Sequence, residues 1–196
     1  MWVVTADQRG SRVVGERVAE LLAGLPRVAG VVRPAERTVG DEVQAVLDDA
    51  RGTVDLALHL LRGGGWSVGI GAGPVDEPLP ASSRAASGEA FILAREAVEA
   101  AKSRHRSVPL AVRGADHAAA ADAEAVLTLV AAVAARRSTA GWEVADLAAA
   151  GEGQGATARR LGISVQAVSQ RLRAALWAEE TAARPAAARL LVAAAG

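Results

Sequence analysis

Residues 2–114 switch several times between two patterns of apolar and polar positions. Short apolar runs that end in Gly, Pro or Asp predict strands at 2–7, 28–39, 42–49, 66–75 and 108–114. Apolar side chains three and four residues apart predict helices at 11–25, 50–64 and 89–105. In the first helix the apolar positions include Val14 and Val18, Ser11 is the expected N-cap, and Gly24 with Pro26 marks the end.

The strands at 28–39 and 42–49 lie on either side of Gly40 and Asp41. A Gly–Asp pair between two strand-like runs predicts a tight hairpin, and Pro34 places the first of these strands at an edge or a bulge. The order is therefore strand, helix, strand, strand, helix, strand, helix, strand. We predict an α/β domain with the split βαβ, ferredoxin-like arrangement and one added helix and strand.

After Gly114 the pattern becomes purely helical. Helices are predicted at 118–137, 141–150, 156–161, 165–178 and 186–194. The domain boundary is placed at this change, which gives a ferredoxin-like domain at 1–114 and an all-helical domain at 115–196. The longest apolar run, 125–135, is shorter than a bilayer-spanning helix, so we expect no membrane contact.

The sequence GATARRLGISVQAVSQRLRAAL at 155–176 predicts two short helices joined by a tight turn. Gly162 stands where the chain must turn, and glycine adopts positive φ without steric cost. Ile163 fills the turn, and Ser164 is a good N-cap for the second helix. The buried seam of that helix follows at a spacing of four, with Val168, Leu172 and Leu176. Together these features predict a helix-turn-helix.

The outward face of the second helix carries polar and basic side chains. In a helix-turn-helix the early positions of this face reach base edges in the major groove; here they are Gln166, Ala167, Gln170 and Arg171. Gln can pair with adenine, and Arg with guanine, through two hydrogen bonds. The remaining candidates are expected to bind phosphates and are Thr157, Arg159, Arg160, Ser164 and Arg173. An ordinary helical hairpin with solvated arginines is the alternative explanation.

The same segment resembles the helix-turn-helix units of sigma-factor region four and related regulators, in which LGIS followed by QAVSQRL is a common form. The resemblance implies double-stranded DNA as the partner.

Charge and composition indicate which part of the chain binds nucleic acid and in which compartment the protein is found. The chain has 22 basic and 22 acidic residues, yet from Gly151 onward six Arg face three Glu, a surplus of three positive charges. Nucleic-acid binding by the C-terminal part alone fits this distribution. The absence of cysteine excludes disulfides and thiolate zinc sites. The N-terminal residues lack the pattern of a signal peptide, so we expect a cytoplasmic protein.

Two aspartates are the candidates for chemistry in the front domain. Asp7 ends the first strand and Asp41 lies in the hairpin, so in the predicted fold the two carboxylates can face each other. Such a pair can hold Mg²⁺ and a nucleotide triphosphate. The alternative is structural: Gly40 and Asp41 form a tight turn, and Asp7 caps the helix that follows.

Five pieces of sequence stand in a fixed order along the chain: ADQRGSR at 6–12, GDEVQAVL at 40–47, VGIGAGPV at 68–75, GEAFILAREAVEAAK at 88–102, and the helix-turn-helix segment. With these pieces in this order the chain resembles proteins of the SatD family. That family pairs a palm-like domain, similar to nucleotide and diguanylate cyclases, with a C-terminal helix-turn-helix. Here VGDEV lacks the second glycine and the aromatic residue of the diguanylate cyclase signature, and no Lys or Arg cluster follows it. We therefore expect no catalytic activity.

Two other features do not indicate a site. The stretch GIGAG at 69–73 is followed by Pro74 and not by a helix, so it is not a dinucleotide-binding fingerprint. We interpret its glycines as allowing a neighbouring element to approach a strand. His59, His105 and His117 have no carboxylate or second His at ligand spacing, which favours core or surface roles.

The whole sequence predicts a sequence-specific transcription regulator whose degenerate cyclase-like domain senses a ligand or forms a dimer. No cofactor is assigned, although Mg²⁺ or a nucleotide at Asp7 and Asp41 is kept as a candidate ligand. Two alternatives stay open. One is a metal- or nucleotide-binding, cyclase-related enzyme that the helix-turn-helix targets to DNA. The other is a scaffold whose helical domain binds protein.

A homodimer is expected because one small helix-turn-helix buries too little surface for tight binding. The motif uses its apolar seam for its own core, so the flanking helices are the expected subunit contact. Their spare apolar residues are Val126, Leu127, Leu129, Val130, Val133, Leu190, Leu191 and Val192. The protein's own core is the alternative partner for the last three.

Overall fold

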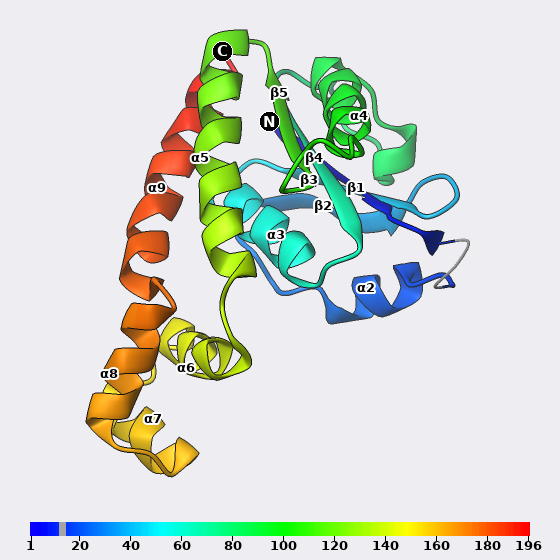
Figure 1. Cartoon of the computed structure of the whole chain (residues 1–196). Coiled ribbons are helices and arrows are strands. Elements are labelled where there is room, and N and C mark those ends of the chain that lie inside the picture. Colours follow the sequence, from blue (N-terminus) through cyan, green and yellow to red (C-terminus); the bar gives the residue numbers. More distant parts are fainter. Residues whose placement is uncertain (12–14) are drawn as a thin grey trace.

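A mixed five-stranded sheet forms the first part of the protein (Figure 1). The computed structural model describes residues 1–11 and 15–196. The strands are β1 (Trp2–Gln8), β2 (Val31–Arg37), β3 (Glu42–Leu47), β4 (Trp66–Ala72) and β5 (Leu110–Gly114), and they lie in the order β2-β3-β1-β4-β5. The parallel pair is β4 and β5, whereas the other neighbouring strands are antiparallel. The predicted succession of strands and helices in this part is confirmed.

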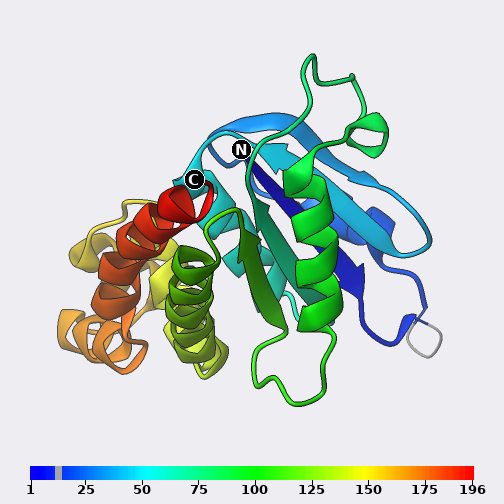
Figure 2. The same ribbon diagram turned by 90° about the horizontal axis from the view of Figure 1, so that it is seen from above.

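Helices cover both faces of the sheet (Figure 2). One face packs against α4 (Glu89–Ala101), and the other packs against α3 (Ala50–Arg62), α5 (His117–Ala135) and α9 (Trp177–Ala194). Alternation along β1 explains this division, because Val3 faces the α4 side while Trp2 and Val4 belong to the larger apolar cluster on the other side. The sheet is therefore buried on two faces.

Two glycines of β4 bring α4 against the sheet. A Cβ atom added to Gly69 would lie 2.2 Å from the backbone nitrogen of Val98, and one added to Gly71 would lie 2.1 Å from the carbonyl oxygen of Ala90. Any side chain at these positions would collide with the α4 backbone. The interpretation of GIGAG as a close-packing site is confirmed.

The predicted hairpin is confirmed, whereas the first helix differs from the prediction. The turn between β2 and β3 contains Gly40 at φ +62°, and the edge strand β2 has irregular pairing on both sides of Pro34, as expected. The first helix is shorter than predicted: α2 spans Val18–Gly24 and its N-cap is Arg17, so the expected cap at Ser11 is wrong. The apolar position at Val14, and Arg12 of the ADQRGSR piece, lie outside the described residues.

The second part of the chain is helical and includes a small lobe, which we define as residues 139–174 and which contains α6 (Thr139–Ala149), α7 (Gln154–Leu161) and α8 (Val165–Ala174). The lobe has an apolar cluster of its own, centred on Val144, Ala158 and Val168. Figure 1 shows the lobe extending away from the sheet, with α7 and α8 at its far end. We call the remaining described residues the body.

The last helix is longer than predicted. It begins at Trp177, and not near residue 186, and it runs through Pro185. The preceding helix, α8, is shorter than predicted and ends at Ala174, because Leu176 adopts a left-handed conformation with φ +50° and separates the two helices. Leu176 is 42% exposed, so its assignment to the buried seam of the second motif helix is wrong.

The apolar contacts of the body cross the predicted domain boundary. Leu127 of α5 and Leu191 of α9 belong to the same buried cluster as the sheet residues. The Trp2 indole N–H donates to the carbonyl of Leu191 (3.0 Å), which joins the two ends of the chain. The protein's own core thus covers much of the C-terminal segment, which was the alternative to a subunit contact. A division into domains at Gly114 stays a prediction.

By length and composition alone α5 could cross a membrane, contrary to the expectation from the sequence. Core helices of this kind pass the same test. In this structure α5 buries Ala123, Leu127, Val130 and Ala131 against the sheet and its neighbouring helices.

Candidate nucleic-acid interface

The connection between α7 and α8 has the predicted local geometry. Gly162 ends α7 in the left-handed region at φ +66°, and the N–H of Ile163 donates to the carbonyl of Ala158 (3.0 Å), which closes the turn. The hydroxyl oxygen of Ser164 accepts a hydrogen bond from the N–H of Ala167 (3.1 Å) and caps α8. The turn glycine and the cap are therefore confirmed.

The apolar seam fixes which face of α8 points outward. Val168 is buried against Val144 of α6 and Ala158 of α7, while Leu172 is partly buried beside it. Residues on the opposite side of the helix are exposed. They are Gln166, Gln170, Arg173 and Ala174.

The cations of the lobe differ in how they are paired. Arg160 pairs with Glu152 (3.2 Å) and Arg171 pairs with Glu143 (3.4 Å). These pairs are partly or fully open to water and contribute little to stability, so both arginines can exchange their carboxylates for phosphates. Arg159 and Arg173 are exposed and form no ion pair with another described residue.

Three of the predicted DNA-contacting residues need correction or refinement. Thr157 is only 2% exposed, so its hydroxyl cannot reach a phosphate. Arg171 lies toward α6, where Glu143 holds it, and not at the centre of the outward face. Ala167 is half-buried at the edge of that face. The outward positions are therefore Gln166, Gln170 and Arg173.

A buried polar joint attaches the lobe to the body. Arg137, which follows α5, forms an ion pair with Glu180 of α9, and the two side chains are 0% and 1% exposed. Arg137 also donates two hydrogen bonds to the carbonyl of Ala175 (3.1 and 2.9 Å) at the end of α8. Its guanidinium lies 4.3 Å from the ring centroid of Trp142 in α6. One side chain thus contacts α6, α9 and the end of α8.

The structure also brings the two candidate aspartates of the front domain near each other. The backbone N–H of Gln8, next to Asp7, donates to the carbonyl of Asp41 (3.3 Å). The Asp7 carboxylate pairs with the ammonium of Lys102 (3.1 Å), and Arg17 holds the N-cap position of α2, so Asp7 is not the cap of that helix. Burial raises the pKa of Asp7 above its usual value; Lys102 opposes this rise, and the negative charges of Asp41 and Glu99 add to it.

A metal site at Asp7 and Asp41 stays a prediction. No group of three or more His, Cys, Asp or Glu residues that could hold a metal ion occurs within residues 1–11 and 15–196. An open groove of about 880 Å³ lies near the start of β3, between α4 and the turn that joins β2 to β3. Glu42 and Gln44 of β3 line this groove together with Arg84 and Arg95.

Comparison with protein-family models, with curated proteins and with solved structures gives no match to this chain. Support for a function therefore comes from the geometry of the molecule itself.

The sequence does not predict the contacts that join distant segments. Lys102 is predicted only as part of a helix, yet in the structure its ammonium pairs with Asp7, which lies 95 positions earlier in the chain. Likewise, Arg62 of α3 forms a bidentate ion pair with Asp146 of α6 (2.6 and 2.8 Å). A Lys or Arg near the end of a helix was the available signal, but such residues are common on solvated faces.

Proposed function

We propose that the protein is a sequence-specific, DNA-binding transcription regulator that uses α7 and α8 as a helix-turn-helix. The observation that carries this proposal is the joint placement of a left-handed Gly162, a Ser164 cap and an outward face with Gln166, Gln170 and Arg173. In this motif the N-terminal half of the second helix enters the major groove. Gln166 and Gln170 are suited to adenine edges, and Arg173, near the end of α8, is suited to a phosphate.

Charge and position also support DNA as the partner. The lobe holds four arginines against three acidic residues, and one of these, Asp146, is occupied by Arg62 of the body. Because α7 and α8 lie at the far end of the lobe (Figure 1), a duplex can approach α8 without meeting the sheet. Such a function is consistent with a cytoplasmic location.

The strand order supports the ferredoxin-like, cyclase-related arrangement that the SatD resemblance implies for the front domain. Strands β4, β1, β3 and β2 are adjacent in this order and each is antiparallel to its neighbour, with β5 added beside β4. This is the strand order of a split βαβ fold with one extra strand. In our proposal the domain has no catalytic role and serves ligand sensing or assembly.

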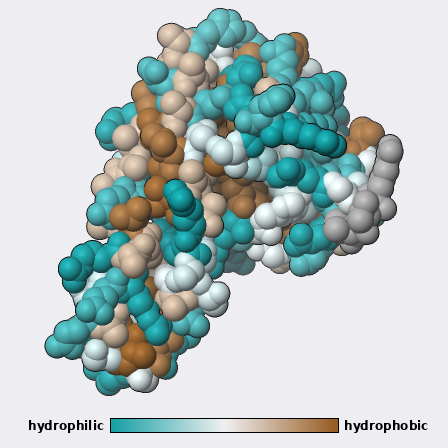
Figure 3. Space-filling view, viewed as in Figure 1, coloured by the Kyte–Doolittle hydropathy of each residue, from teal (hydrophilic) through white to brown (hydrophobic). Residues whose placement is uncertain are grey.

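A dimer is the expected assembly of this regulator. Leu129 of α5 is 68% exposed and Val192 of α9 is 55% exposed, and Figure 3 shows hydrophobic surface over these two helices. By contrast, three of the expected contact residues are buried in the protein's own core: Leu127, Val130 and Leu191. A second copy packed on Leu129 and Val192 would place two α8 helices on half-sites about 10 base pairs apart, or a multiple of this spacing. Sedimentation of the wild type beside Leu129→Glu tests this contact.

The experiment for DNA binding starts with selection of the best duplex from a random pool, followed by titration of that duplex and a shuffled one. Gln170→Ala should weaken binding to the selected site by about 1–3 kcal/mol and leave the shuffled duplex unaffected. Arg173→Ala should lower the affinity for the selected duplex.

Arg189→Ala is the matched control, because Arg189 is an exposed arginine of α9 outside the lobe. This variant should bind both duplexes like the wild type. Failure of the wild type to bind any duplex in a salt-dependent way would overturn the proposal. Equal losses for Gln170→Ala on both duplexes would contradict its role in reading bases.

One observation favours a second candidate, a nucleotide-binding enzyme related to the cyclases. The groove lined by Arg84 and Arg95 runs beside Glu42, and Glu42 pairs in register with Asp7 across β3 and β1. Incubation with each nucleoside triphosphate and Mg²⁺ tests this candidate. Turnover that Asp7→Asn abolishes would establish it, and absence of turnover with every triphosphate would exclude it.

A further inference from the structure

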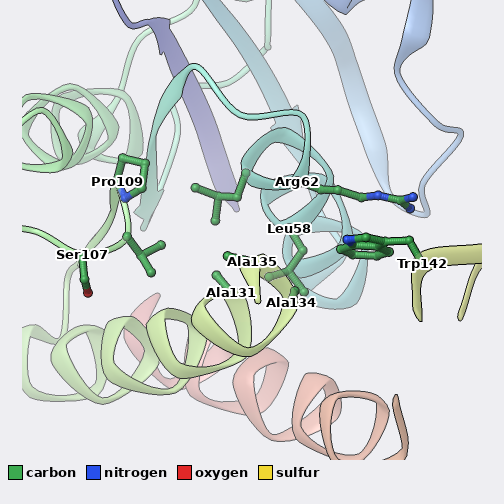
Figure 4. Close-up of a pocket in the computed structure, with 10 residues that line it drawn as sticks. Leu58, Arg62, Ser107, Pro109, Ala131, Ala134, Ala135 and Trp142 are labelled. Carbon is green, nitrogen blue, oxygen red and sulfur yellow. The ribbon is translucent and has the colours of Figure 1, made fainter. Parts of the chain in front are cut away.

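A second hollow in the molecule lies where the lobe meets the body. We call it the Trp142 pocket. It has a volume of about 230 Å³ and is bounded by α3, by the loop before β5, by α5, and by Trp142 of α6. Figure 4 shows Ser107 and Pro109 at one end and Arg62 with Trp142 at the other, with Leu58 and alanines of α5 between them. A cavity of about 150 Å³ holds a benzene molecule, so this pocket can hold one aromatic ring with a short substituent.

The pocket is open because the residues of α5 that border it are small. Ala131, Ala134 and Ala135 lie on the side of α5 that faces it. Leucine at any of these positions would fill the space. Leu58 and Leu61 of α3 provide larger apolar walls, and Trp142, whose ring also contacts the guanidinium groups of Arg62 and Arg137, closes one end. These walls suit a flat, apolar group.

The charged residue of the lining is a cation. Arg62 borders the pocket, and its guanidinium lies 3.7 Å from the ring centroid of Trp142. It pairs with Asp146, but the two side chains are 39% and 50% exposed. Such an exposed pair is weak, so a carboxylate brought to the pocket by its apolar part can replace Asp146 on Arg62.

We propose that the Trp142 pocket binds a small aromatic carboxylate. The ring lies between Leu58, the α5 alanines and Trp142, and the carboxylate pairs with the Arg62 guanidinium in place of Asp146. Because Trp142 and Asp146 belong to the lobe, while Leu58 and Arg62 belong to the body, the ligand touches both parts. Its binding is therefore linked to the position of α6. This inference does not depend on DNA binding.

The first test is a calorimetric titration of the full chain with phenylacetate and, as a neutral counterpart, benzyl alcohol. Phenylacetate should bind saturably with a Kd below about 1 mM. Arg62→Gln should weaken phenylacetate at least tenfold and leave benzyl alcohol unchanged. Arg51→Gln is the control, because Arg51 is an exposed arginine of the same helix that does not line the pocket.

A larger side chain in the pocket tests whether the ligand binds there. Ala135→Leu acts from the exposed rim, so the fold is expected to tolerate it, and it should weaken phenylacetate at least tenfold. Ala125→Leu, at an exposed position of the same helix, should not. Absence of saturable binding, or binding that Ala135→Leu leaves unchanged, would overturn the site. Equal affinity for phenylacetate and benzyl alcohol would overturn the role of the carboxylate.

The position of the lobe is measured separately with a pair of spin labels. The chain contains no cysteine, so Glu96→Cys in α4 and Ala174→Cys in α8 provide two unique exposed attachment points. Saturation with phenylacetate should shift or broaden the distance distribution between the labels. The same addition to the Ala135→Leu background should leave it unchanged. An unaltered distribution in the wild-type background would overturn the link to α6.

Discussion

Replacement of Glu180 by alanine tests how strongly the polar joint holds α9 to the rest of the molecule. Glu180 is 3% exposed. One of its carboxylate oxygens accepts from Arg137, and the other accepts from Nε and Nη2 of Arg184 (3.2 and 2.5 Å). The alanine variant removes the counter-charge of a fully buried guanidinium. Arg137 keeps its two hydrogen bonds to the carbonyl of Ala175 but has no other carboxylate in contact among the described residues.

The size of the effect follows from this burial. Removal of one partner of a buried ion pair costs about 3–5 kcal/mol because it leaves an uncompensated charge. Arg184 adds little, since its side chain is 32% exposed and can be hydrated once the carboxylate is lost. A domain of ordinary stability has about 5–15 kcal/mol in total, so Glu180→Ala should lose a large part of it. Glu180→Gln keeps an acceptor for Arg137 and should lose less.

Urea unfolding followed by circular dichroism measures this loss. Glu179→Ala is the matched control, because Glu179 is an exposed acidic residue in the same turn of α9; it should change stability by no more than about 0.5 kcal/mol. A loss below about 1 kcal/mol for Glu180→Ala, or a loss equal to that of the control, would show that the joint is not a desolvated charge pair.

Further predictions concern pH, packing and the turn. Burial acts to raise the pKa of Glu180, but hydrogen bonds from Arg184 and Arg137 outweigh it and lower the pKa below its ordinary 4.5. The stabilisation by the Glu180 carboxylate is therefore present above pH 4.5 and is lost as the pH falls through the lowered pKa, so the difference in unfolding free energy between wild type and Glu180→Gln should become smaller in acid. A difference that does not change with pH would contradict this role of the carboxylate. Gly71→Ala forces a Cβ against the α4 backbone at 2.1 Å and should cost at least about 1–3 kcal/mol in urea unfolding; a neutral result would show that α4 shifts freely. Gly162→Ala meets no atom within 4 Å and should cost only about 1 kcal/mol, through its positive φ. Ser164→Ala removes the cap of α8 and should cost about 1 kcal/mol, whereas Ser164→Asp should fold as well as the wild type.

Features that depend on a few consecutive residues were predicted from the sequence. The turn at Gly162, the cap at Ser164 and the hairpin at Gly40 are of this kind, because the conformation of glycine and the reach of a serine hydroxyl are decided within one turn of chain. The strands and most of the helices were also found, since each must bury one face and therefore repeats its apolar positions.

The start of α9 could not be predicted from neighbouring residues. The predicted helix begins at residue 186, directly after Pro185, and a proline inside a helix removes one backbone hydrogen bond. In the structure the helix begins at Trp177 instead; Glu180 pairs with Arg137, and Ala187, Leu191 and Ala194 are buried in the main apolar cluster. The packing of the whole segment outweighs the one backbone hydrogen bond that proline removes.

The order of strands and helices, the glycine turn and serine cap between α7 and α8, and the types of side chain on the outward face can all be predicted from the order of the residues. Which of these side chains are free to bind a partner depends on how the helices and strands pack. This packing buries Thr157, turns Arg171 toward Glu143, pairs Asp7 with Lys102, and forms the Trp142 pocket from α3, α5 and α6. The physical reason is that burial and charge pairing depend on distances between residues far apart in the chain, whereas helix periodicity and capping depend on neighbours.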